Sequence, residues 1–124
     1  MAALSYATVG SNRLEEAKAF YDALLGSIGL SPLMDHPSGG RVYGKEGRPV
    51  FAVLGPYNKE PATAGNGAMC GFTFDSPAEA MAFHEKAIEL GGTDEGAPGE
   101  RAPGFYGGYF RDIEGNKFAG FHMA

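Results

Sequence analysis

Three histidines are the residues of this chain best suited to hold a metal ion, because imidazole nitrogen is a common ligand of divalent transition metals. They are His36, His84 and His122. A metal site needs ligands that converge, and the spacing of these three gives no sign of convergence. His84 also falls on a segment that we expect to be a helix packed against the outside of a sheet. We therefore interpret all three as surface or partly buried imidazoles.

The single thiol, Cys70, is a candidate nucleophile. Strand alternation places it on the same side as Phe72 and Phe74, facing a helix, and opposite to Met69. A reactive cysteine needs an electropositive and reachable environment, so we interpret Cys70 as a packed, inert thiol. One cysteine also excludes an intrachain disulfide and gives no reason to expect an oxidising compartment.

Arg101, Tyr109 and Arg111 are the polar side chains that we expect to matter most, and Arg111 is best interpreted, with Asp112, as part of a hairpin turn. Arg101 follows a Gly-x-x-Gly segment, where its guanidinium could pair with a carboxylate or phosphate of a ligand or remain a solvated charge. Tyr109 stands next to a run of glycines, and its hydroxyl could contact a ligand or its ring could roof the core. No Gly-x-Ser-x-Gly motif, phosphate loop or pair of catalytic acids can be assigned.

Charge and hydropathy exclude several classes of partner. The net charge is -5, and the ten basic residues are scattered, so no basic stripe is available for nucleic acid or for an anionic membrane surface. No window approaches the roughly 18 apolar residues of a spanning helix, and the N-terminus does not read as a secretory leader. We expect a cytoplasmic protein without nucleic-acid or membrane partners.

A repeat at an offset of 63 residues organises the chain. Ala17, Ala19, Phe20 and Asp22 recur in kind as Ala80, Ala82, Phe83 and Glu85. A repeat of half the chain is usually stable only when it packs on its copy, so the join between copies is the natural place for a pocket. We expect a single domain over residues 1–124, with one module at about 3–57, a linker at about 58–66 and a second module at about 67–124.

Periodicity and turn residues predict an α+β chain with the order β-α-β-β-β in the first copy. A helix over about 13–27 is expected, with an Asn12-x-x-Glu15 start signal and Gly29 as its end. Its buried face should carry Leu14, Ala17, Tyr21, Leu24, Leu25 and Ile28. The strands are expected at 4–9, 31–36, 41–45 and 49–54.

The same β-α-β-β-β order of elements is expected in the second copy of the repeat. Its helix begins with a fuller capping box, in which Ser76 is the N-cap, Pro77 takes the first helical position and Glu79 the third, and it stops at Gly91. Strands are expected at 68–74, 105–111 and 117–122, with a short or irregular strand within 93–104. The turn at 112–116 should use Gly and Asn where a positive φ is needed.

Three motifs of the chain stand out together. They are the helical residues 16–22, the Gly91 stop followed by Gly96-Ala97-Pro98-Gly99-x-Arg101, and Tyr106-Gly-Gly-Tyr-Phe-Arg-Asp-x-x-Gly-Asn-Lys117. In this combination the chain resembles the vicinal oxygen chelate superfamily, which includes glyoxalase I, extradiol dioxygenases, fosfomycin-modifying enzymes and bleomycin-binding proteins. The resemblance implies two βαβββ modules whose curved mixed sheets form a cup around a ligand. We interpret the hairpin residues Arg111-Asp112 and Asn116-Lys117 as a marker of this family and not as part of a site.

The resemblance also implies where metal ligands would stand in metal-dependent members. On this chain those positions fall at Tyr6, Met69 and Ala119, with a fourth near Phe51. Tyr, Met, Ala and Phe are poor ligands for a divalent cation, which prefers imidazole nitrogen or carboxylate oxygen. We therefore expect no metal cofactor in the cup.

Two functional classes follow from the resemblance. The first is a protein that binds a small, partly hydrophobic molecule in a cup lined by Tyr6, Thr8, Phe51, Val53, Met69, Tyr109, Ala119 and Phe121, with Arg101 near its mouth. The second is a glyoxalase-like lyase or isomerase, or a dioxygenase, with an atypical metal site or a metal-free mechanism involving Tyr6 or Tyr109. The missing ligands favour the first class. As in many relatives, a homodimer is expected.

Overall fold

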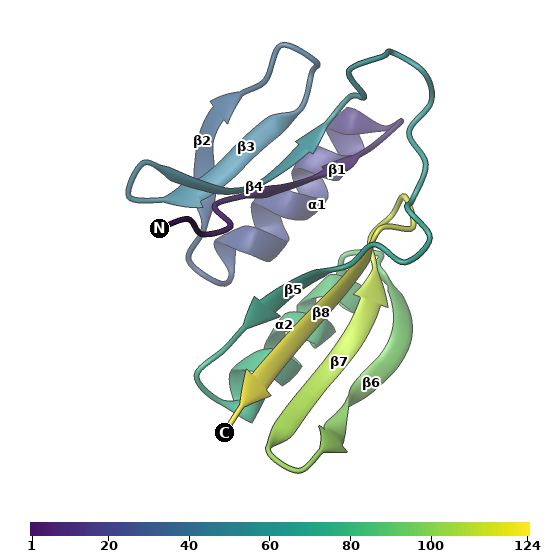
Figure 1. Cartoon of the computed structure of the whole chain (residues 1–124). Helices are drawn as coiled ribbons and strands as arrows, with labels where there is room; N and C mark the ends of the chain where they lie inside the picture. Colours follow the sequence, from purple (N-terminus) through teal and green to yellow (C-terminus); the bar gives the residue numbers. More distant parts are fainter. The chain divides into compact units, whose positions relative to one another are not determined.

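The computed structural model describes residues 1–124 and divides into two compact units, Met1–Ala64 and Gly65–Ala124 (Figure 1). The first unit consists of β1 (Ala7–Gly10), α1 (Leu14–Gly26), β2 (Ser31–Asp35), β3 (Arg41–Lys45) and β4 (Arg48–Leu54). The second consists of β5 (Cys70–Thr73), α2 (Pro77–Glu89), β6 (Thr93–Ala102), β7 (Phe105–Arg111) and β8 (Lys117–Met123). The predicted β-α-β-β-β order is confirmed in both units.

Each unit has one four-stranded mixed sheet that is not closed. The strand orders are β1-β4-β3-β2 and β5-β8-β7-β6, so the two units share one topology. In each sheet the first strand runs parallel to the last, and the other pairs are antiparallel. The bounds of β1 and α1 recur in β5 and α2 at the predicted offset of 63 residues, which confirms the α+β fold and its repeat.

The core of the first unit lies between α1 and one face of its sheet. Tyr21 of α1 packs against Phe51 of β4, with ring centroids 4.9 Å apart, and against Tyr43 of β3. Phe20, which the predicted helix face omitted, is also buried, whereas Leu14 and Ile28 are only half-buried. The apolar face of α1 is thus shifted slightly around the helix from the predicted stripe.

The start signal predicted at Asn12 is wrong in its chemistry. Arg13 occupies the N-cap position and makes no side-chain capping hydrogen bond. The Asn12 amide instead bonds the backbone of Ala62, donating Nδ2–H to its carbonyl at 3.0 Å and accepting its N–H at 2.7 Å. Gly29 follows the last turn in the left-handed region at φ 89°, close to the predicted stop.

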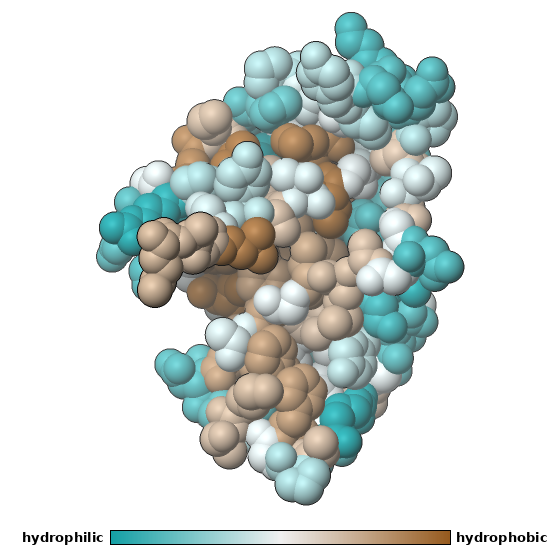
Figure 2. All heavy atoms as spheres, in the orientation of Figure 1, coloured by the Kyte–Doolittle hydropathy of each residue, from teal (hydrophilic) through white to brown (hydrophobic).

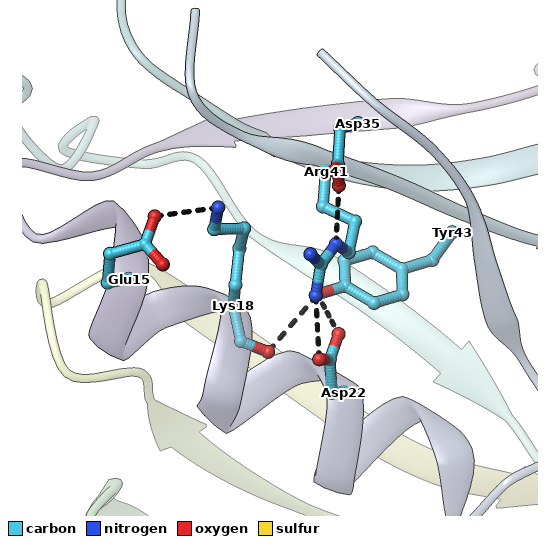
Figure 3. Close-up of polar contacts among 6 residues, drawn as sticks. All are labelled: Glu15, Lys18, Asp22, Asp35, Arg41 and Tyr43. Atoms are coloured by element: carbon cyan, nitrogen blue, oxygen red, sulfur yellow. Dashed lines mark hydrogen bonds and ion pairs between the residues drawn. The ribbon is translucent and has the colours of Figure 1, made fainter.

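A polar network ties α1 to the strands of the same unit. The Asp22 carboxylate accepts hydrogen bonds from the Arg41 guanidinium and the Tyr43 hydroxyl, both at 2.7 Å (Figure 3). Arg41 also bonds Asp35 at 2.8 Å, and this bond lowers the pKa of that carboxyl. Burial, followed by the hydrogen bond to Asp22, raises the pKa of Tyr43, which therefore stays a neutral donor. The network is structural, since it fixes where the helix lies on its sheet.

The core of the second unit is a cluster of phenylalanines. Phe83 of α2 lies at its centre, with its ring 5.1–5.5 Å from those of Phe72, Phe74 and Phe110. Gly120 lets this ring approach the sheet, because a Cβ there would lie only 2.6 Å from a carbon of Phe83. The predicted capping box of α2 is confirmed: the Ser76 hydroxyl oxygen accepts the N–H of Glu79 at 3.2 Å.

The β6–β8 region completes the second sheet. β6 runs over ten residues with several register shifts, as the Gly- and Pro-rich segment predicted. In the β7–β8 turn, Gly115 has φ 95° and Asp112 Oδ1 accepts the N–H groups of Glu114 and Asn116. Asn116 needs no positive φ; its side chain bonds Asp112 instead. Neither α1 nor α2 combines the length and the hydrophobicity needed to cross a lipid bilayer.

Candidate functional site

The sheet of the second unit has one face that α2 does not cover, and we call it the open face. Phe110 and Phe118 point toward α2, so their neighbours in the alternating strands point the other way. The register pairs Tyr109 with Ala119 and Ala119 with Gly71, which places them on one side. The open face comprises Gly71, Thr73, Gly99, Arg101, Phe105, Gly107, Tyr109, Arg111, Lys117, Ala119 and Phe121.

Figures 1 and 2 look onto this face. In Figure 1 the strands of the second unit lie in front of α2. Figure 2 shows brown to white, hydrophobic to near-neutral residues over the middle of these strands, with teal, hydrophilic residues along the margin on the side of β6. An apolar surface with a polar margin suits a ligand that is partly hydrophobic.

Two cations lie over the ring of Tyr109. The Arg101 guanidinium carbon is 5.5 Å from the ring centroid, and the Lys117 ammonium nitrogen is 5.4 Å from it. Both distances fall in the range of cation–π attraction. Arg101 is held in this position by a 2.6 Å hydrogen bond from Nη2 to the carbonyl of Ala97. Gly96 makes room for it, because a Cβ there would lie 3.1 Å from Nη2.

The other end of the open face is aromatic. The rings of Phe105 and Phe121 stack at 5.2 Å with an interplanar angle of 16°. Gly71 and Gly107 form the floor beside them, since a Cβ at either position would come within 3.0–3.3 Å of Phe121. Phe121 can therefore lie close against the sheet. The face thus joins a flat aromatic surface to a cationic end around Tyr109.

The structure brings three of the predicted site residues together on one face. Arg101, Tyr109 and Ala119 share the open face, and Met69 is exposed just before β5, the edge strand of the same sheet. Tyr6 is exposed in the first unit, just before β1. The expected position of Phe51 is wrong: it is 1% exposed and its ring packs on Tyr21, so it faces α1 and not the uncovered side.

The fourth position implied for a metal ligand is corrected by the register. Thr8 pairs with Ala52, and Gly71, its repeat-mate 63 residues on, pairs with Ala119. Ala52 is therefore the counterpart of Ala119, in place of Phe51; Val53, also expected in the cup lining, is fully buried on the helix side. Alanine offers no donor atom, so the side chains at these positions do not fit a metal site. No three His, Cys, Asp or Glu side chains converge in the chain.

His84 and Cys70 lie on the helix side of the second sheet. His84 is buried, and its Nε2 is 3.1 Å from both Asp94 Oδ1 and the carbonyl oxygen of Tyr109. A carbonyl only accepts, so Nε2 carries a proton, and His84 holds the backbone of β7 at Tyr109 from the helix side. Burial raises the pKa of the Cys70 thiol, and the Asp112 carboxylate adds to this effect. The interpretation of Cys70 as a packed thiol agrees with this environment.

Lys117 and Phe105 are site residues that the sequence prediction missed. Lys117 was interpreted as a hairpin marker, yet the register pairs it with Arg111 on the open face. Its alternation with Ala119 and Phe121 along β8 was the available signal. Phe105 likewise alternates with Tyr109 along β7.

A separate groove of about 950 Å³ lies within the first unit, beside the segment that follows β4. Its lining includes His36, Ser38, Tyr57, Lys59 and Glu60. The backbone N–H of Ser38 donates to His36 Nδ1 at 3.1 Å, so this nitrogen is an acceptor. The groove also carries one basic and one acidic side chain, Lys59 and Glu60, and the Ser38 hydroxyl lies 2.9 Å from the same His36 nitrogen.

Comparison with known proteins gives matches among solved structures. A glyoxalase/bleomycin resistance protein from Albidiferax ferrireducens T118 is 39% identical, with 98% of each chain covered and a TM-score of 0.87. A glyoxalase/bleomycin resistance protein/dioxygenase family enzyme from Burkholderia phytofirmans PsJN is 21% identical over 99% of this chain and 100% of that one, with a TM-score of 0.79. Lactoylglutathione lyase from Agrobacterium tumefaciens is 20% identical over 98% and 94% of the chains, with a TM-score of 0.72.

No family model matches the chain, and no curated protein does. The likenesses near 20% identity support the fold alone. The first match is different, because 39% identity extends over nearly the whole of both chains. The chain therefore belongs to the glyoxalase/bleomycin resistance protein family of the vicinal oxygen chelate superfamily, in agreement with the resemblance of its motifs.

Proposed function

We propose that this protein binds a small, partly hydrophobic molecule on the open face of its second unit. The observation that supports this most directly is that three half-buried aromatic rings, those of Phe105, Tyr109 and Phe121, lie on this one face. Gly71 and Gly107 let Phe121 lie flat against the sheet, and the aromatic rings provide a large contact area for a flat ligand. The relative of 39% identity bears a name that includes bleomycin resistance, which is consistent with a small-molecule binder.

The proposal includes no metal. The positions at which relatives would place ligands are Tyr6, Ala52, Met69 and Ala119 here, and this donor set does not fit a divalent cation. Binding would then depend on shape, apolar contact and the polar groups around Tyr109. A lyase or dioxygenase activity would require ligands from other residues.

A neutral fluorescent dye tests this proposal. N-phenyl-1-naphthylamine becomes bright on apolar surfaces, and we expect saturable binding to the wild-type protein in EDTA. Tyr109→Ala and Phe121→Ala should each weaken binding about fivefold or more, because each removes an aromatic contact. The matched control is Tyr57→Ala, which removes a fully exposed tyrosine of the first unit and should leave binding unchanged. Melting curves by circular dichroism establish that each variant is folded.

Other outcomes would contradict the proposal. Absence of saturable binding, or equal loss in the Tyr57 control, would remove the open face as the site. A transition metal retained at about one per chain after purification, with dye binding lost in EDTA, would favour the lyase or dioxygenase. The predicted homodimer is a separate proposal, and sedimentation equilibrium tests it.

A further inference from the structure

The open face carries a local charge that is opposite to that of the whole chain. The net charge of the protein is -5, with ten basic residues in all. Three of the ten, Arg101, Arg111 and Lys117, lie on this one face, and Glu95 is the one carboxylate that forms ion pairs with them. A cluster of one sign on a protein of the other sign raises the local concentration of ligands of the opposite charge.

Arg101 is the cation of this cluster most available to a ligand. Arg101 forms no ion pair with a carboxylate, and its hydrogen bond is to the backbone carbonyl of Ala97. The Asp94 carboxylate still interacts with its charge, since the N–H of Gly96, His84 and Arg101, in this order, lower the pKa of Asp94. That bond uses one N–H of a guanidinium that has five. The same bond and the Tyr109 ring hold the group in place, so less side-chain entropy is lost when it binds an anion.

Lys117 is only weakly neutralised. Its ammonium nitrogen is 4.0 Å from Glu95 Oε1, whereas Arg111 bonds the same oxygen at 2.7 Å. Glu95 is therefore largely paired with Arg111. Lys117 and Arg101 come from β8 and β6, on either side of β7, and their charged groups lie 5.4 Å and 5.5 Å from the Tyr109 ring centroid.

We infer that the ligand is an organic anion, with its carboxylate or phosphate held by Arg101 and Lys117 beside Tyr109 and its flat apolar body lying toward Phe121. This inference rests on the proposed function and narrows it to one class of ligand. Arg and Lys both recognise such groups, Arg through its planar fork and Lys as a point charge. A neutral molecule of the same shape would gain the apolar contacts alone.

Two dyes of one skeleton test the inference. 8-Anilinonaphthalene-1-sulfonate carries one negative charge, and N-phenyl-1-naphthylamine is its neutral counterpart. We expect the wild-type protein to bind the anionic dye about tenfold more tightly at low salt, a preference that added KCl should reduce. Arg101→Gln and Lys117→Gln should each lower the affinity for the anionic dye about three- to tenfold and leave that for the neutral dye nearly unchanged. Arg48→Gln is the control, because it removes the same charge from an exposed position in the first unit.

The results separate the inference from the proposed function. If neither dye binds, the proposed function fails, and the inference fails with it. If the neutral dye binds as tightly as the anionic one, or if Arg48→Gln has the same effect as Arg101→Gln, the inference alone is overturned. Displacement of the anionic dye by 1-naphthoate and by 1-naphthyl phosphate, but not by 1-naphthol, would support it and show which anionic group is preferred.

Discussion

Replacing Gly120 by alanine should destabilise the second unit, and the cause should be a single ring. A Cβ at position 120 would lie 2.6 Å from a carbon of Phe83, about 0.8 Å short of ordinary van der Waals contact. The ring cannot easily move away, because Phe72, Phe74 and Phe110 surround it. Overpacking of this kind typically costs about 2 kcal/mol of unfolding free energy.

The double variant Gly120→Ala/Phe83→Ala tests whether the contact with the Phe83 ring causes this destabilisation. Phe83→Ala alone should cost about 3 kcal/mol, because Phe83 is 1% exposed and its loss leaves a cavity. If the two effects were independent, the double variant would lose about 5 kcal/mol. We expect instead a loss of about 3 kcal/mol or less, because the methyl group introduced by Gly120→Ala would enter the cavity left by the Phe83 ring.

Urea unfolding followed by far-UV circular dichroism measures these free energies, since the chain contains no tryptophan. Gly26→Ala is a suitable control: a Cβ there meets nothing within 4 Å, and the residue ends α1. It should be neutral or stabilise by up to about 1 kcal/mol. Additive losses from Gly120→Ala and Phe83→Ala would refute the contact between these two residues as the origin of the effect.

Three further predictions concern individual side chains. Tyr43→Phe should lower the unfolding free energy by about 1.5 kcal/mol, because it removes a buried hydrogen bond to a carboxylate. The measurement is urea denaturation, and an unchanged unfolding free energy would mean that water replaces the hydroxyl at Asp22 without cost. Ser76→Ala should lower the unfolding free energy by about 1 kcal/mol, because it removes the cap of α2, whereas Ser76→Thr should retain most of the stability. An unchanged unfolding free energy in Ser76→Ala would show that the cap contributes nothing. Cys70 should react with iodoacetamide more slowly than a free cysteine and only at higher pH, because its pKa is raised and the thiolate is the reactive form. A labelling rate with the same pH dependence as that of a free cysteine would contradict this.

Features encoded by neighbouring residues were predicted well from the sequence. The strands at 41–45 and 105–111 have the predicted bounds, and the capping box at Ser76 forms as expected. Turn residues, strand alternation and capping depend on contacts a few residues apart, so their signals survive in a single sequence. The family fold also followed, because its closing hairpin is a local motif.

Features that depend on distant residues were predicted poorly. The residue of β4 that corresponds to Ala119 of β8 was predicted to be near Phe51, whereas the register shows that it is Ala52. An error of one residue in a strand exchanges the two faces of the sheet, so the predicted side chain faces α1. Asn12 bonds a backbone 50 residues away, so no nearby residue could have shown that it is not a cap. Lys117 lies near Arg101 and Tyr109 only because β8, β7 and β6 pair side by side in the sheet.

Each unit carries its own helix and its own aromatic core, and this has an evolutionary consequence. Packing constrains the side of each sheet that faces its helix, where a glycine such as Gly120 tolerates nothing larger. On the opposite side, exposed positions such as Thr73 and Arg101 bear less of that constraint, so mutations at them can accumulate without loss of folding. A duplicated half can in this way acquire new specificity while its sister copy keeps the ancestral surface, which is a physical reason why one scaffold supports many unrelated activities.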